Sequence, residues 1–272
     1  MRRIAHLSDL HFGRHDDRVV AGLLSALTTL SPDVVVISGD FTQRARRRQF
    51  AAARDFLAGL RAAGLPVVAV PGNHDIPLYD VLRRFLRPLA RFRRYIEPAE
   101  YPFVADEEIA VLGINTARSL TIADGRVSHD QMACIEQIFA RAAPGARRML
   151  VTHHPLVSLP GGPEGRALRA AGRSGSAIEA AVRANVHLLL AGHHHQPFHG
   201  SGATFFAAGH SLLVVQAGTT TSTRLRAHAN SFNLIETNGD ALRIAVHAWD
   251  ADGFEAASLE AYRCVDGRWQ ES

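Results

Sequence analysis

The chain has 272 residues, and 47% of them are hydrophobic, which is enough to bury a substantial core. Its formal net charge is +4, but all 30 basic residues are arginine, a usage that is weak evidence for a nucleic-acid partner. Two cysteines, Cys134 and Cys264, are too few for a disulfide framework or a cysteine-based zinc site. We find no signal-peptide pattern and no apolar run of about 18 residues, so we expect a soluble, cytoplasmic protein without a transmembrane segment.

Short apolar runs and helical periodicities alternate from the N-terminus. Ile4–Leu7 predicts a strand, the apolar spacing over Val19–Leu30 predicts a helix, and Val34–Ile37 predicts a second strand. A helix over Phe50–Leu60 and a strand over Val67–Val70 repeat the pattern. Buried strands that alternate with helices are typical of a largely parallel sheet that is covered on both faces.

The second half of the chain adds strands of two kinds. Apolar runs at Ile109–Ile114, Met149–Thr152 and Val186–Ala191 continue the first pattern. Residues 200–272 instead contain short runs separated by glycine or polar turns, which indicates antiparallel strands. Because no linker separates the two parts, we predict one domain over residues 1–272. Its expected architecture is a layered α/β structure with a sheet on each side of the core.

Five of the predicted strands run into loops that are rich in aspartate, asparagine and histidine. Functional groups gather at the carboxyl ends of strands in sheets of this kind. Each motif alone is a common turn or helix start, but five in succession, three of them with an adjacent glycine, are improbable as turn chemistry. The motifs are Asp9-Leu10-His11, Gly39-Asp40, Gly72-Asn73-His74-Asp75, His153-His154 and Gly192-His193-His194-His195.

This ordered set resembles the signature of the calcineurin-like metallophosphoesterase superfamily and extends from residue 9 to residue 195. The resemblance implies an α/β/β/α sandwich of mixed sheets flanked by helices, with a dinuclear metal centre. Carboxylate and imidazole ligands without thiolate suit two divalent or trivalent ions such as Mn, Fe, Zn or Co, and do not choose among them. The resemblance assigns Asp9, His11, Asp40 and His195 to one ion, and Asp40, Asn73, His153 and His193 to the other.

Two such ions about 3.5–4 Å apart would bind the phosphoryl oxygens and generate a bridging hydroxide at neutral pH. The resemblance gives His74 no metal; it would stabilise the transferring phosphoryl group or protonate the leaving oxygen, and it would contact substrate beside Asn73. Asp75 would orient His74 or cap the helix start. His154 and His194 adjoin ligands on extended segments, so we expect both to point away from the metals.

Three segments are candidates for substrate selection. Leu78–Ile96 predicts an amphipathic, arginine-rich helix that covers a nucleotide or meets a lipid headgroup, or else an ordinary surface helix. Leu159–Gly175 is glycine-rich and could close over a phosphate. Thr42–Arg46, which begins two residues after Asp40, is a third candidate contact surface.

Within the superfamily, the chain is most similar to bacterial class III cyclic-nucleotide phosphodiesterases and their glycerophosphodiesterase relatives. We therefore expect hydrolysis of a small phosphodiester, with cyclic AMP (cAMP) or a glycerophosphodiester as substrate. One alternative is a nucleotide-lipid pyrophosphatase of the UDP-diacylglucosamine type; another is a non-catalytic metal-binding interaction module, against which His74 argues. A nucleic-acid substrate is disfavoured because no basic stripe is interleaved with aromatic residues. Peripheral membrane contact and a homodimer are further expectations.

Overall fold

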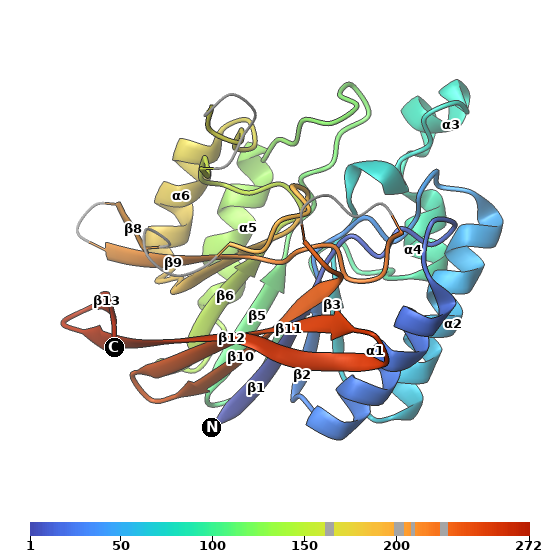
Figure 1. Ribbon diagram of the computed structural model, residues 1–272. Coiled ribbons are helices and arrows are strands. Elements are labelled where there is room, and N and C mark those ends of the chain that lie inside the picture. Colours follow the sequence, from blue (N-terminus) through green and yellow to red (C-terminus); the bar gives the residue numbers. More distant parts are fainter. Residues whose placement is uncertain (161–165, 199–203, 208–209, 224–227) are drawn as a thin grey trace.

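Two β-sheets face each other across a shared apolar layer (Figure 1). The computed structural model describes residues 1–160, 166–198, 204–207, 210–223 and 228–272. Within these ranges no helix combines the length and the apolar character needed to cross a membrane. Helices cover the outer face of each sheet, so the predicted α/β/β/α layering is confirmed.

The first sheet joins the two ends of the chain. Its strand order is β13-β12-β11-β10-β1-β2-β3, in which β1, β2 and β3 are parallel and β10 is antiparallel to β1. The strands after residue 230 pair as antiparallel neighbours, as their turn-separated runs predicted, whereas His210–Gln216 of the same predicted region pairs in parallel with Leu188–Ala191 in the other sheet. The elements of this half are β1 (Arg2–Leu7), α1 (Asp17–Leu30), β2 (Val34–Ile37), α2 (Arg47–Ala62), β3 (Val67–Ala69), the short 3₁₀ helix η1 (Asn73–Asp75), β10 (Ser231–Asn238), β11 (Ala241–Asp250), β12 (Gly253–Val265) and β13 (Arg268–Glu271).

The second sheet is built from the middle of the chain. Its order is β4-β5-β6-β7-β9-β8, with β5, β6, β7 and β9 parallel and an antiparallel strand at each edge. The strands that carry the five motifs are therefore divided between two sheets, β1 to β3 in one and β6 and β7 in the other. The remaining elements are α3 (Val81–Leu86), α4 (Ala90–Tyr95), β4 (Phe103–Ala105), β5 (Ile109–Gly113), α5 (His129–Phe139), β6 (Arg147–Val151), α6 (Ser174–Arg183), β7 (Leu188–Ala191), β8 (Thr204–Ala207) and β9 (His210–Gln216).

Both faces of the central strands are buried, which explains their uninterrupted apolar sequences. In β2, Val34 and Val36 face the layer between the sheets, whereas Val35 and Ile37 pack under α1 and α2. On the other side, α5 and α6 cover the second sheet (Figure 1). Burying one such aliphatic side chain stabilises the fold by about 1.5–3 kcal/mol. This packing holds the carboxyl ends of β1, β2, β3, β6 and β7 in fixed positions.

The single helix predicted over Leu78–Ile96 is wrong, because the segment forms two short helices, α3 and α4. Pro88 lies between them, and a proline disfavours the helical conformation at the residue before it. Arg87 accordingly leaves the helical region, with φ −147° and ψ 58°. The basic, apolar segment is therefore bent, and α3 projects from the body of the protein (Figure 1).

Candidate metal centre

Left-handed backbone turns follow three of the five strands that carry the motifs, β1, β2 and β7. Asp9, His11, Asp40, His193 and His195 all have positive φ angles, between 50° and 74°. Non-glycine residues seldom adopt this conformation, but aspartate and histidine tolerate it better than most. The turns after β1 and β2 are locked together, because the backbone N–H of Asp9 donates to Gly39 O at 3.1 Å and that of His11 to Asp40 O at 2.9 Å. The geometry turns these side chains toward a common point.

One cluster at this point consists of two carboxylates and two imidazoles. The Nε2 atoms of His11 and His195 lie 3.3 Å apart. Oδ1 of Asp9 lies 3.2 Å from His195 Nε2 and 3.6 Å from His11 Nε2. Ligand atoms from Asp9, His11, Asp40 and His195 all lie within 4.8 Å of one another, so this group could hold a metal ion.

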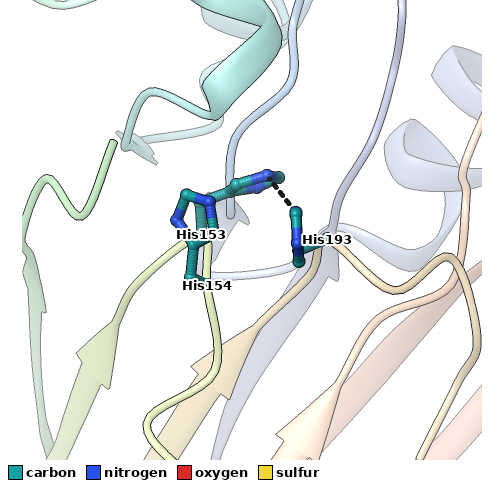
Figure 2. Close-up of side chains that lie close together, drawn as sticks. All are labelled: His153, His154 and His193. Atoms are coloured by element: carbon teal, nitrogen blue, oxygen red, sulfur yellow. Dashed lines mark hydrogen bonds between the residues drawn. The ribbon is translucent and has the colours of Figure 1, made fainter. Parts of the chain in front are cut away.

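A second cluster adjoins the first: His153, His154 and His193 each offer a nitrogen within 4.8 Å of the others, so this group too could hold a metal ion. Figure 2 shows their rings side by side, with Nε2 of His153 3.3 Å from Nδ1 of His193. The amide oxygen Oδ1 of Asn73 lies 3.1 Å from the same His153 nitrogen. Nδ1 of His153 donates to Ser38 O at 2.8 Å, which leaves a lone pair on Nε2. The ring is thereby fixed in the tautomer that binds a metal.

Asp40 lies between the two clusters. Its Oδ2 is 3.7 Å from His11 Nε2 in the first cluster and 3.6 Å from His153 Nε2 in the second. Its other oxygen, Oδ1, accepts a hydrogen bond from the backbone N–H of His74 at 2.8 Å. A single carboxylate oxygen therefore faces imidazole nitrogens of both clusters.

The donor set fits metal ions better than it fits a hydrogen-bond network. Oδ1 of Asp9 is buried and has no hydrogen-bond partner within the described ranges, although Oδ2 accepts from Ser8 Oγ and from the backbone N–H of His193. Burial opposes ionisation of Asp9 and Asp40, but the neighbouring imidazoles outweigh it and lower the pKa of both carboxyl groups. Burial also lowers the pKa of His11 and His193. Ionised carboxylates and neutral imidazoles are the protonation states that metal ligands need.

His74 stands beside these clusters without joining either. Its ring is edge-on to that of His11, with the centroids 4.9 Å apart. Nδ1 of His74 lies 2.9 Å from the carbonyl oxygen of Gln43, so it carries the proton and donates. Gln43, which lies within the predicted Thr42–Arg46 surface, therefore orients His74. Within the described ranges, no hydrogen bond joins the side chains of Asp75 and His74, so Asp75 does not orient this ring directly.

Asp75 instead ties two loops together. Its Oδ2 accepts from the backbone N–H groups of Gly72 and Phe41, and its Oδ1 accepts from the backbone N–H and the hydroxyl of Thr42. The hydrogen bond from Gly72 N caps the start of η1, which agrees with the prediction that Asp75 caps this helix. Burial and the nearby charge of Asp40 raise the pKa of Asp75 to about 7. This carboxyl group joins the turn after β2 to the turn after β3.

His154 belongs to the second cluster, but its two nitrogens also have hydrogen-bond partners outside it. Its Nδ1 is 2.9 Å from Thr116 Oγ1 and its Nε2 is 3.0 Å from Ala123 O. Burial, reinforced by neighbouring His153, lowers the pKa of His154 to about 3. Although its ring lies beside those of His153 and His193 (Figure 2), both of its nitrogens serve the loop after β5. These contacts occupy both nitrogens, yet His154 also belongs to a group that could hold a metal ion, so the expectation that it faces away from the ions stays a prediction.

Two glycines let the turns approach each other. A Cβ atom at Gly72 would overlap Asp40, and one at Gly192 would overlap Ser8 and come within 2.8 Å of Asp9 Oδ2. Sequence reasoning missed Ser8 and Ser38, which hold Asp9 and His153. Their positions directly before a motif were the only signal for them.

The rim of the site is formed by α3 and by the loop after β5. Buried Arg84 donates to the carbonyl oxygens of Ser119, Pro77 and Thr121, which fastens α3 to this loop. In the same loop, Ile122 O accepts from Nδ2 of Asn73 at 3.1 Å. The predicted phosphate loop, Leu159–Gly175, lies in part outside the described residues, since the structure does not describe 161–165.

Comparison with known proteins gives one family and several relatives. The model of the calcineurin-like phosphoesterase family matches residues 2–197. The chain is 25% identical to the 3′,5′-cyclic adenosine monophosphate phosphodiesterase CpdA of Escherichia coli K12, over 98% of this chain and 92% of the relative. It is 27% identical to the glycerophosphodiester phosphodiesterase GpdQ of Enterobacter lignolyticus, over 56% of this chain and only 57% of the relative.

Solved structures agree on the fold. A dimetal phosphatase from Danio rerio superposes with a TM-score of 0.63 at 12% identity, covering 94% of this chain and 99% of the other. Purple acid phosphatase from yellow lupin gives a TM-score of 0.65 at 13% identity, covering 95% of this chain and 53% of the other. Because the family model spans most of the chain, the protein belongs to the calcineurin-like phosphoesterase family and is a metal-dependent phosphoesterase.

Proposed function

We propose that this protein is a dinuclear hydrolase of small phosphodiesters in which water is the nucleophile. The observation that carries the proposal is the position of Asp40 Oδ2, 3.7 Å from His11 Nε2 and 3.6 Å from His153 Nε2. A carboxylate oxygen that faces both imidazole clusters is what a shared ligand of two ions requires.

In this proposal Asp40 is common to both ions, and each ion has three further protein ligands. When bound, the two ions supply Lewis acidity for the phosphoryl oxygens and lower the pKa of a water molecule to near neutrality. The mixed oxygen and nitrogen donors suit Mn, Fe, Zn or Co. The ligands are Asp9, His11, Asp40 and His195 for one ion, and Asp40, Asn73, His153 and His193 for the other.

His74 is the proposed proton donor to the leaving oxygen. Because its Nδ1 donates to Gln43 O, the opposite nitrogen, Nε2, is the one that can exchange a proton with substrate. The edge-on contact with His11 supports its place beside the phosphoryl group. Asn73, whose backbone leads into His74, completes the proposed substrate contact.

The proposed substrate is cAMP or a glycerophosphodiester. The relatives named for these two activities are the support, one of them matched over nearly its whole length. A probable cyclic nucleotide phosphodiesterase of a Synechococcus strain, 28% identical over 75% of this chain and 77% of the relative, adds to the first choice.

The second candidate is a pyrophosphatase for a nucleotide-linked lipid, and an exposed apolar surface favours it. Seven of the ten exposed large hydrophobic residues within the described ranges lie on the rim of the site. A UDP-2,3-diacylglucosamine pyrophosphatase of Chlamydia muridarum is 36% identical, although over only 28% of this chain and 23% of the relative. We call the residues the α3 surface: Tyr79, Val81, Leu82, Phe85, Leu86, Leu120 and Ile122.

One panel separates these functions. Protein loaded in turn with Mn, Fe, Zn or Co is assayed with bis(p-nitrophenyl) phosphate, cAMP, a glycerophosphodiester and a nucleotide-lipid diphosphate. Turnover of the first three without the fourth supports the phosphodiesterase, whereas turnover of the fourth alone supports the pyrophosphatase. Two bound ions with no turnover of any substrate would leave the non-catalytic metal-binding module and refute the proposal.

A further inference from the structure

A surface cavity of about 540 Å³ borders the candidate catalytic site. Gln43 and Arg44 line this cavity and also line the smaller pocket that contains Asn73 and His74. The two spaces therefore meet at the segment that follows Asp40. A substrate whose phosphodiester lies at His74 can extend into the larger cavity.

Four arginines line the larger cavity, and no aspartate or glutamate does; they are Arg14, Arg44, Arg46 and Arg48. None of the four forms an ion pair with a carboxylate in the part of the chain that the structure describes. Three other arginines do form ion pairs: Arg18 pairs with Asp252, Arg54 with Asp55 and Arg83 with Asp80. The cavity thus concentrates uncompensated positive charge, which attracts an anion.

This positive charge lies at the N-terminal end of α2, where helices usually have acidic residues. Arg46 is the N-cap of α2, and the first turn has no acidic residue. By contrast, α1 begins with Asp16 and Asp17. The N-terminal end of a helix carries a partial positive charge, so cationic side chains there are unfavourable until an anion binds. Arginines at the N-terminal end of a helix are locally unfavourable, and unfavourable local features beside a catalytic site are typical of a ligand site.

Gln43 supplies a further polar group on the cavity wall. Its side chain is 95% buried, and its Oε1 has no hydrogen-bond partner within the described ranges. Rotation of the terminal amide by half a turn presents the N–H₂ group in the same place. Gln49 makes the wall rigid, because its Oε1 accepts from the backbone N–H groups of Arg44 and Arg46.

We propose that this arginine cavity binds a second phosphate group of the substrate. The inference rests on the proposed hydrolysis of small phosphodiesters but changes the preferred substrate, because cAMP and glycerophosphodiesters have only one phosphate. The substrate class is then a small nucleotide with a phosphodiester and a further phosphate, such as a 5′-phosphorylated dinucleotide. Arginine suits this part because its planar guanidinium group binds phosphate oxygens in pairs.

The test compares two dinucleotides that differ by one phosphate, pApA and ApA. The metal-loaded wild type should show a kcat/KM for pApA roughly 10–100-fold above that for ApA, as expected for charge-assisted bonds to one phosphate. In Arg46→Gln/Arg48→Gln this ratio should fall to near one. Arg14→Gln, on a different loop, should lower the ratio as well, and serves if the double variant fails to fold.

The matched control is Arg47→Gln. Arg47 is exposed in the same helical turn but does not line the cavity, so this variant should keep the wild-type ratio. Equal kcat/KM values for pApA and ApA in the wild type, or an equal loss of the ratio in Arg47→Gln, would overturn the proposal.

Binding measurements separate this proposal from the proposed function. Calorimetric titration of the metal-loaded His74→Ala protein with pApA and ApA reports the cavity even if no dinucleotide is hydrolysed. A tighter Kd for pApA that depends on Arg46 and Arg48 supports the cavity, and equal Kd values refute it. Oligothymidylate of about ten nucleotides, bound more than 10-fold tighter than pApA, would refute the small-nucleotide assignment in favour of a strand.

Discussion

Asp40→Asn tests the shared ligand while it disturbs little else. Asparagine has nearly the same shape, tolerates the φ of 53° at this position, and can still accept the bond from His74 N. It removes the negative charge and places a neutral amide opposite His11 Nε2 and His153 Nε2. Any change in metal content therefore reports the charge of the carboxylate.

The size of the effect follows from the ligands that remain. Two unit charges 4 Å apart attract by about 4 kcal/mol at an effective dielectric constant near 20, which corresponds to roughly 10³-fold in affinity. The first ion would keep Asp9 as an anionic ligand, whereas the second would keep only the neutral groups of Asn73, His153 and His193. We expect the second ion to bind at least about 10³-fold more weakly and turnover to fall by a similar factor.

The assay is metal content by mass spectrometry after gel filtration, together with hydrolysis of bis(p-nitrophenyl) phosphate. Asp55→Asn is the control, because Asp55 is an exposed carboxylate paired with Arg54. We expect two ions per chain in that control and no more than one in Asp40→Asn. Two ions bound with wild-type affinity in Asp40→Asn would refute the shared ligand.

Three further predictions concern the proton donor, the metal and a buried histidine. His74→Ala should keep both ions and lose about 10²–10⁴-fold in kcat, and ordinary turnover would exclude His74 as the proton donor. Removing the metal with EDTA should lower Tm by roughly 5–10 °C, because ions at 100 times their Kd stabilise the folded state by about 2.7 kcal/mol; an unchanged melting curve would contradict this. Burial lowers the pKa of His6 to about 3, so the unfolded chain binds a proton that the folded chain does not as pH falls below about 6.5. The free energy of unfolding should therefore fall by about 1.4 kcal/mol for each unit that the pH drops below about 6.5, owing to His6 alone. Denaturant titrations should show a shallower pH dependence of this free energy in His6→Gln but not in exposed His129→Gln.

Single strands, turns and helix ends could be predicted from the sequence, because each is determined by residues that are close together in the chain. β2 occupies the predicted range Val34–Ile37, because a run of β-branched residues ended by Ser-Gly-Asp specifies a buried strand and its turn. The break in the helix at Pro88 is also readable from the sequence, because a proline disfavours the helical conformation at the residue before it. Both features involve residues only a few positions apart.

Features that depend on distant residues could not be read in this way. A buried strand looks the same in either sheet, so the division of β1 to β3 from β6 and β7 has no local signal. The bond from His153 to Ser38 O joins residues 115 positions apart. The arginine cavity likewise combines Arg14 from the turn after β1 with arginines around the start of α2. Only the folded chain brings these groups together.

The left-handed turns at Asp9, His11, Asp40, His193 and His195 also restrict how this centre can be redesigned. Aspartate, asparagine, histidine and glycine enter this conformation readily, whereas β-branched side chains do not. A ligand residue that is introduced to bind another metal must therefore first be able to adopt a positive φ angle at its position. Among common ligand residues, substitutions between aspartate, asparagine and histidine vary the coordination chemistry while leaving the turn intact.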